Sequence, residues 1–186
     1  MRQKMAGERI VFASGFEGLF SKELRAHVTP ACDAELRRLG VFIDKPFLPG
    51  YPVEKWAEVV EALAQHLYPN ESREAAYWKL GRSTVRGFGE TIIGKAAFAF
   101  MKLVGPVRSV ERAARNYANT NNYTVVGLNR TGPTSFDFHL NEQHTIPEFD
   151  MGVVEAILEY VGAKSPVVTL VSKDSEGFTM HLEWQA

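Results

Sequence analysis

Three arginines at helical spacing are the sharpest candidates for chemistry in this sequence. Arg108, Arg112 and Arg115 stand at positions i, i+4 and i+7, so a helix through them places their guanidinium groups along one stripe. Guanidinium groups bind carboxylates and phosphates through paired hydrogen bonds. Asn116 and Asn119 follow, and their amides both donate and accept hydrogen bonds. The pattern predicts that these five residues form the anion-binding end of a ligand site.

Two structural explanations of the same arginines stay open. Charges on an exposed helical face are usually solvated or paired, so Arg108 and Arg115 could pair with Glu111 and with acids elsewhere. Arg112 or Arg115 could instead bond backbone carbonyls at the start of the sheet. Solvation or pairing is the commoner outcome for such a stripe.

Aromatic side chains are numerous enough to line a hollow as well as to fill a core. The chain has 12 Phe, 6 Tyr and 3 Trp, and many of them fall on apolar faces of predicted elements. We predict that Phe88, Phe98, Met101 and Phe149 line an apolar pocket between helices and sheet. Ordinary core packing is the competing explanation for each of them.

Patterns typical of catalysis and metal binding are missing from the sequence. His139 and His144 flank Glu142 without a convincing third ligand at close spacing, and Cys32 is the only cysteine. No Gly-x-Ser-x-Gly elbow occurs, and no pair of carboxylates stands in an apolar segment that would raise a pKa. Gly87-Phe-Gly89 lacks the Lys-Ser or Lys-Thr of a phosphate loop. We therefore predict a protein that is not an enzyme and uses neither metal nor cofactor.

Composition favours one folded domain over residues 1–186. Apolar residues make up 45% of the chain and charged residues 23%, which are ordinary globular values. The net charge of −1 gives no global field for nucleic acid, so no nucleic-acid partner is expected. With one cysteine and no apolar run near the roughly 18 residues of a membrane span, we predict a cytoplasmic protein without such a span.

Hydrophobic periodicity predicts a helical part over about 14–118 and a sheet part over about 122–185. A short apolar run at 10–13 suits a strand or an extended arm, 42–51 reads as a loop, and the clearest helix starts at Pro52. The glycines between 81 and 94 predict close helix packing or a break near Gly87. Two hairpins, at 122–141 and 166–184, flank a helix that begins at Pro147. We predict an α+β fold in which N-terminal helices pack on a four-stranded antiparallel sheet, with the order α-ββ-α-ββ in the C-terminal half.

Several segments resemble known proteins. Tyr51-Pro-Val-Glu-Lys-Trp56, Gly105-Pro-Val-Arg-Ser-Val-Glu-Arg112 and Arg115-Asn-Tyr with Asn121-Asn-Tyr123 resemble a paralogous family of uncharacterised domains expanded in myxobacteria. The order of elements is similar to the superfamily of haem nitric-oxide sensors, vinyl-reductase-type ligand-binding domains and small TRAPP subunits. That resemblance implies an α+β fold around an apolar pocket, and binding or sensing in place of catalysis. It does not extend to haem or zinc, because the axial histidine, the Tyr-x-Ser-x-Arg signature and the cysteine-rich ending have no counterparts.

These observations lead to two predictions of function. The first is a non-enzymatic sensory or small-molecule-binding domain for an apolar or amphipathic ligand, whose acidic end Arg112 and Arg115 would hold. Such a domain would signal through a homodimer or a protein partner. The alternative is an interaction adaptor that dimerises through a helix or sheet face without a ligand.

Overall fold

The computed structural model describes residues 7–112 and 117–185, so the predicted site residues Arg115 and Asn116 lie outside the described residues. The chain runs in the order β1 (Ile10–Phe12), α1 (Ala13–Leu19), α2 (Lys22–His27), α3 (Pro30–Arg38), β2 (Gly50–Pro52), α4 (Val53–Leu67), α5 (Arg73–Glu90), α6 (Ile92–Glu111), β3 (Val126–Gly132), β4 (Ser135–Leu140), α8 (Pro147–Tyr160), β5 (Lys164–Lys173) and β6 (Phe178–Gln185).

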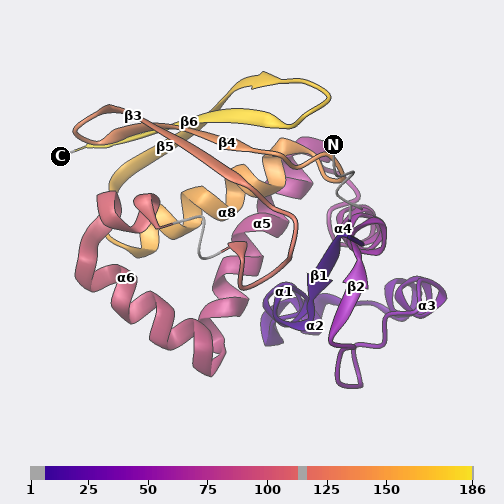
Figure 1. The fold of residues 1–186 in the computed structure, drawn as a ribbon. Helices are drawn as coiled ribbons and strands as arrows, with labels where there is room; N and C mark the ends of the chain where they lie inside the picture. The colour runs from indigo at the N-terminus through magenta and orange to yellow at the C-terminus, as the bar shows by residue number, and fades with distance from the viewer. Residues whose placement is uncertain (1–6, 113–116, 186) are drawn as a thin grey trace.

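The C-terminal half forms a four-stranded antiparallel sheet in the order β3-β4-β6-β5. Phe136 lies opposite Leu182 and Phe138 opposite Met180, and all four side chains are buried. They share one hydrophobic cluster with residues of α8, which lies beneath the sheet (Figure 1). The predicted α+β class, with the two hairpins flanking α8 and helices over the apolar face of the sheet, is confirmed.

A second, two-stranded sheet joins β1 to β2 in the helical half. Ile10 lies opposite Pro52, and Val11 opposite Tyr51. Residues 10–12 of the run at 10–13 therefore form a strand, as one of the two readings predicted, and Ala13 begins α1. The loop predicted at 42–51 was wrong at its end, because Gly50 and Tyr51 belong to β2. The Tyr51 ring is buried with its centroid 4.3 Å from that of Phe16, a contact that local Pro and Gly content does not reveal.

Helix α5 runs without a break from Arg73 to Glu90. Its glycines let the backbones of neighbouring helices approach closely. A Cβ atom on Gly81 would lie 2.0 Å from the Phe149 carbonyl oxygen, and one on Gly87 would lie 2.2 Å from that of Gly18. A Cβ atom on Gly152 of α8 would lie as close to the carbonyl oxygen of Trp78. Of the two predicted roles for these glycines, close helix packing is therefore the one observed, and α5 lies directly against α1 and α8.

Helix α6 bends at Gly105, where φ is +80°. The single hydrogen of the Ser109 hydroxyl is shared between the carbonyl oxygens of Gly105 at 2.8 Å and of Met101 at 3.1 Å, which stabilises the bend. The restart predicted at Gly105-Pro106 is confirmed as far as Glu111. Within the described part of the chain, no helix combines the length and the apolar character that crossing a membrane requires.

Candidate functional site

An apolar hollow of about 130 Å³ lies between α1, α5, α6 and α8. Phe88 and Val85 of α5, Phe98 and Met101 of α6, and Ile157 of α8 contribute to its wall. The Phe88 and Phe98 rings meet edge to face with their centroids 5.6 Å apart. Ligand sites are commonly hollows of this kind, with apolar and aromatic walls and a few polar groups.

A tight turn between α5 and α6 brings two of these aromatic rings together. Thr91 joins the helices, and its hydroxyl oxygen accepts a hydrogen bond from the Gly94 amide at 2.9 Å, which caps α6. A Cβ on Gly94 would lie only 1.8 Å from the Phe88 carbonyl oxygen, so a larger residue there would force the helices apart. The short connection and the glycine therefore position Phe88 against Phe98.

A second hollow, of about 110 Å³, adjoins the first. Five residues line both hollows: Gly15, Thr84, Tyr117, Thr120 and Val153. Most of the surface of the second hollow is apolar as well, but two acids, Glu142 and Asp150, contribute to its wall and give it the name used below. We call the two the apolar hollow and the polar hollow.

The two carboxyl groups of the polar hollow are buried and held by hydrogen bonds. Glu142 is 7% exposed and Asp150 is 6% exposed. Tyr117 Oη donates to Asp150 Oδ1 at 2.9 Å, and Tyr123 Oη donates to Glu142 Oε2 at 3.1 Å. Glu142 Oε1 also accepts from the backbone amides of Gln143 at 2.8 Å and His144 at 2.6 Å.

Burial changes the protonation of this cluster. Loss of solvent, reinforced by the nearby Glu142, raises the pKa of Asp150 to about 7, although the Tyr117 hydrogen bond opposes the shift. Burial and the neighbouring acids also raise the pKa values of the Tyr117 and Tyr123 phenols, which therefore stay neutral donors. The expectation that no carboxylate pair lies in an apolar setting was wrong, because the pair forms only when the first turn of α8 packs against the segment after β4.

The structure brings some of the predicted site residues together and leaves others apart. Phe88, Phe98, Met101 and Asn119 all line the apolar hollow, whereas Phe149 lines the polar one. Arg108 and Arg112 are exposed and line neither hollow. The Arg112 guanidinium lies over the Phe100 ring at 5.0 Å, and Glu111 approaches Arg130 at 3.8 Å. Anion binding by the arginine stripe stays a prediction.

Sequence reasoning missed Tyr117, Tyr123, Glu142, Thr145 and Asp150. The signal that could have found Asp150 is its place beside Phe149 in the first turn of α8, a turn that also carries the buried Pro147. An acid in the first turn of a helix usually indicates a favourable interaction with the helix dipole, so the position of Asp150 did not by itself indicate a buried site. Thr145 and Glu142 lie in an irregular segment without a period to interpret.

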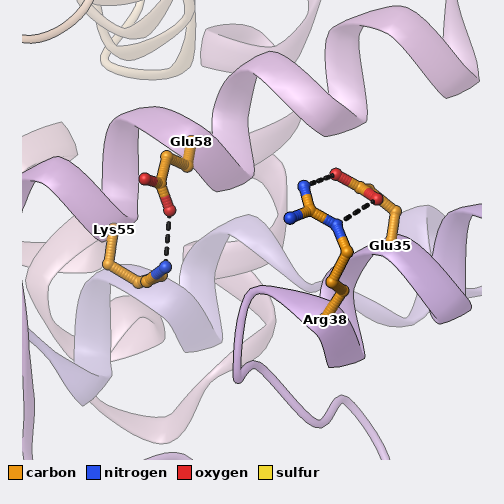
Figure 2. Close-up of polar contacts among 4 residues, drawn as sticks. All are labelled: Glu35, Arg38, Lys55 and Glu58. Carbon is orange, nitrogen blue, oxygen red and sulfur yellow. Dashed lines mark hydrogen bonds and ion pairs between the residues drawn. The ribbon is translucent and has the colours of Figure 1, made fainter.

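A much larger groove, of about 630 Å³, lies between α3 and α4, but its chemistry is that of a charged surface. Figure 2 shows its two ion pairs: Arg38 Nη2 lies 2.6 Å from Glu35 Oε1, and Lys55 Nζ lies 2.5 Å from Glu58 Oε2. Each pair neutralises itself within one helix, and solvent reaches both. Within the described ranges, no group of three or more His, Cys, Asp or Glu side chains is placed to hold a metal ion.

Comparison with protein families matches residues 9–185 to the family described as "Protein of unknown function (DUF2378)". The chain belongs to this family. Comparison of the DUF2378 chain with curated proteins finds no significant match.

Solved structures of H-NOX domains share the fold. An H-NOX mutant from T. Tengcongensis is 11% identical with a TM-score of 0.65, and covers 94% of this chain and 98% of its own. An Fe(II) unliganded H-NOX mutant from K. algicida is 11% identical with a TM-score of 0.62, over 94% and 97%. An oxygen binding H-NOX domain related to soluble guanylate cyclases is 9% identical with a TM-score of 0.67, over 93% and 92%. The predicted likeness in layout to haem nitric-oxide sensors is confirmed, and at these identities it establishes the fold alone.

Proposed function

We propose that this DUF2378 chain is a non-enzymatic domain that binds a small apolar or amphipathic molecule in the apolar hollow. The observation that carries the proposal is the hollow itself, which is lined by aromatic and aliphatic side chains of three helices. Its volume of about 130 Å³ resembles that of engineered apolar cavities, which bind benzene-sized molecules. A ligand that fits this volume is a single ring or a short chain.

The position of the hollow supports a sensory role. Phe98 and Met101 belong to the part of α6 before its bend, and Asn119 and Thr120 belong to the segment that leads to the sheet. A ligand that favours one spacing of these elements shifts the protein toward that arrangement. The oxygen-binding H-NOX domain has the same fold, which supports a binding function in preference to catalysis.

Haem does not fit the residues on these walls. No histidine or cysteine is among the described residues that line either hollow, and the Tyr117 and Tyr123 phenols are neutral donors to carboxylates. No lysine or arginine among those lining residues could hold the propionates, and the carboxylates Glu142 and Asp150 carry the wrong charge. Each hollow is also smaller than the roughly 300–1,000 Å³ of sites for drug-sized ligands. The proposed site therefore works without haem.

Filling the hollow tests the proposal. Ala97 lines it, whereas Ala99 of the same helix is exposed, so Ala97→Phe and Ala99→Phe form a matched pair. Toluene and indole are titrated into each variant and followed by calorimetry and by the chemical shifts of the methionine methyl groups. We expect saturable binding to the wild type and to Ala99→Phe, and at least a tenfold loss in Ala97→Phe. Absence of saturable binding to the wild type, or equal binding by both variants, contradicts the proposal.

Arg108 and Arg112 are not part of the proposed site, since both lie outside the two hollows. Arg112→Ala should therefore leave the affinity for toluene unchanged. Weaker toluene binding in that variant would show that the arginine stripe contributes to the ligand site.

The alternative function, an interaction adaptor, is favoured by a different observation on α6. Ile92 is 89% exposed, Leu103 is 83% exposed and Phe100 is 47% exposed. Exposed apolar side chains gathered on one helix are typical of contact surfaces. If the chain dimerises and Leu103→Ser abolishes the dimer in sedimentation experiments, while no apolar probe binds, the adaptor is the better description.

A further inference from the structure

Two acids in the wall of the polar hollow are placed to bind a positively charged group. Glu142 and Asp150 both line it and are more than nine-tenths buried. Thr145 also lines it and is 6% exposed. A hydroxyl oxygen can accept a hydrogen bond as well as donate one, so Thr145 adds a third kind of acceptor to the two carboxyl groups.

The charges around the hollow favour the same conclusion. Its titratable groups are Glu142 from the segment after β4, Asp150 from α8, and Tyr117 and Tyr123 from the segment before β3. No described residue that lines it carries a positive side chain, and Arg9 contacts His144, which is not among the lining residues. Glu142 and Asp150 repel each other in this buried place, which contributes to the raised pKa of Asp150. A bound cation would relieve that repulsion.

The two hollows adjoin along a shared wall, which sets the shape of a suitable ligand. Thr84, Thr120 and Tyr117 line both hollows. A molecule with its apolar body against Phe88, Phe98 and Met101 would therefore extend its other end past this wall toward the carboxyl groups. An ammonium group has three donors, and the acceptors available are the oxygens of Asp150, Glu142 and Thr145.

We propose that the ligand is a small primary amine, whose aromatic or aliphatic body lies in the apolar hollow and whose ammonium group is bound by Asp150, Glu142 and Thr145. The inference rests on the proposed function, because it needs the apolar hollow to accept the body of the ligand. It assigns the ligand a charge opposite to the one that the arginine stripe predicts. The sign of the ligand's charge is therefore the decisive measurement.

Four probes of similar shape make that measurement. Toluene, benzyl alcohol, benzylamine and benzoate are titrated into the wild-type chain by calorimetry at pH 7.5. We expect benzylamine to bind at least tenfold more tightly than benzyl alcohol, and benzoate to bind more weakly than either. Benzylamine affinity should also rise from pH 6 to pH 8, because Asp150, with a pKa of about 7, must lose its proton to bind the cation.

Variants of the polar hollow identify the groups responsible. Asp150→Asn keeps the size of the side chain and should weaken benzylamine binding at least tenfold, while toluene binding stays unchanged. Thr145→Val removes only the hydroxyl and should weaken benzylamine binding severalfold, which keeps the test available if the Asp150 variant folds poorly. Glu58→Gln, in the surface groove, is the control and should have no effect.

The outcomes separate this inference from the proposed function. Toluene binding without a preference for benzylamine overturns the amine assignment alone. A preference for benzoate overturns it as well and supports the arginine stripe. Binding of neither toluene nor benzylamine overturns both the proposed function and the inference that rests on it.

Discussion

Two pairs of carboxylates in this molecule have the same chemistry and opposite surroundings. Glu35 and Glu58 lie in the open groove between α3 and α4, each beside a basic residue of its own helix (Figure 2). Glu142 and Asp150 lie in the polar hollow and accept hydrogen bonds from phenols and backbone amides. The first pair is solvated and paired with basic residues, whereas the second is buried in a hollow whose described lining residues include no lysine or arginine.

The pKa values show what this difference does. The hydrogen bond from Arg38 lowers the pKa of Glu35, whereas burial raises the pKa of Asp150. Exposed ion pairs contribute about 0–1 kcal/mol to stability, because water screens them and side-chain entropy opposes them. A buried carboxyl group instead couples stability to pH and attracts a compensating charge. Burial, more than residue type, therefore decides which acids could serve a function.

The largest expected effect comes from breaking the contact that buries Asp150. Gly81→Ala places a Cβ against the Phe149 carbonyl, a backbone atom that cannot move unless α8 shifts. We expect a loss of more than about 3 kcal/mol in the free energy of unfolding, measured by urea denaturation. Gly89→Ala is the control, since its Cβ meets the Phe98 ring at 3.1 Å and a ring can yield. Similar losses in both variants would contradict this account.

Asp150→Asn should flatten the pH dependence of stability. The folded-state pKa of about 7 exceeds the ordinary value of 3.8, so the protonated acid stabilises the folded state. That contribution is complete below about pH 4 and is lost as the pH rises through about 7. The wild type should therefore lose roughly 2–4 kcal/mol relative to Asp150→Asn between pH 4 and pH 8, as followed by urea denaturation. Parallel pH profiles would show that Asp150 is solvated.

Tyr117→Phe sharpens the comparison by removing one donor and little volume. The Asp150 Oδ1 atom then loses its hydrogen bond in a buried place, which should destabilise the fold by about 1–3 kcal/mol in thermal or urea unfolding. Tyr160→Phe, at an exposed ring without a described hydrogen bond, should change stability by less than about 0.5 kcal/mol. Equal effects would mean that the Tyr117 bond contributes nothing specific.

The smallest effect belongs to the surface pair. Glu35→Gln removes the charge that Arg38 contacts and should change the free energy of unfolding by less than about 0.5 kcal/mol, and by still less at 1 M salt. Arg38→Gln is the matched variant and should behave in the same way. If either variant lost more than about 1 kcal/mol in the free energy of unfolding, the acids of the surface groove and of the polar hollow would not differ in their contribution to stability as described.

Much of the fold follows from local pattern, and part of the site does as well. The alternation of Phe136, Phe138 and Leu140 indicates a strand with one buried face, and the period of α4 indicates its helix. Phe88 and Phe98 of the apolar hollow could be chosen because aromatic side chains on apolar faces of predicted elements are the usual lining of a pocket. Strand β2 was missed because Gly50-Tyr51-Pro52 is too short to show a period. It exists through its pairing with β1, which is distant in the sequence.

The sequence by itself determined the secondary structure, the apolar faces and the α+β class, because these depend on the spacing of neighbouring residues. Only the tertiary structure decided which polar residues are buried together. Tyr117, Glu142 and Asp150 come from three separate segments, and their protonation depends on the solvent that α8 and its neighbours exclude. Arg112, by contrast, belongs to a regular stripe that the sequence displays plainly and the fold leaves in water. Spacing along the chain reveals periodic faces, whereas the free energy of a charge depends on what surrounds it in three dimensions.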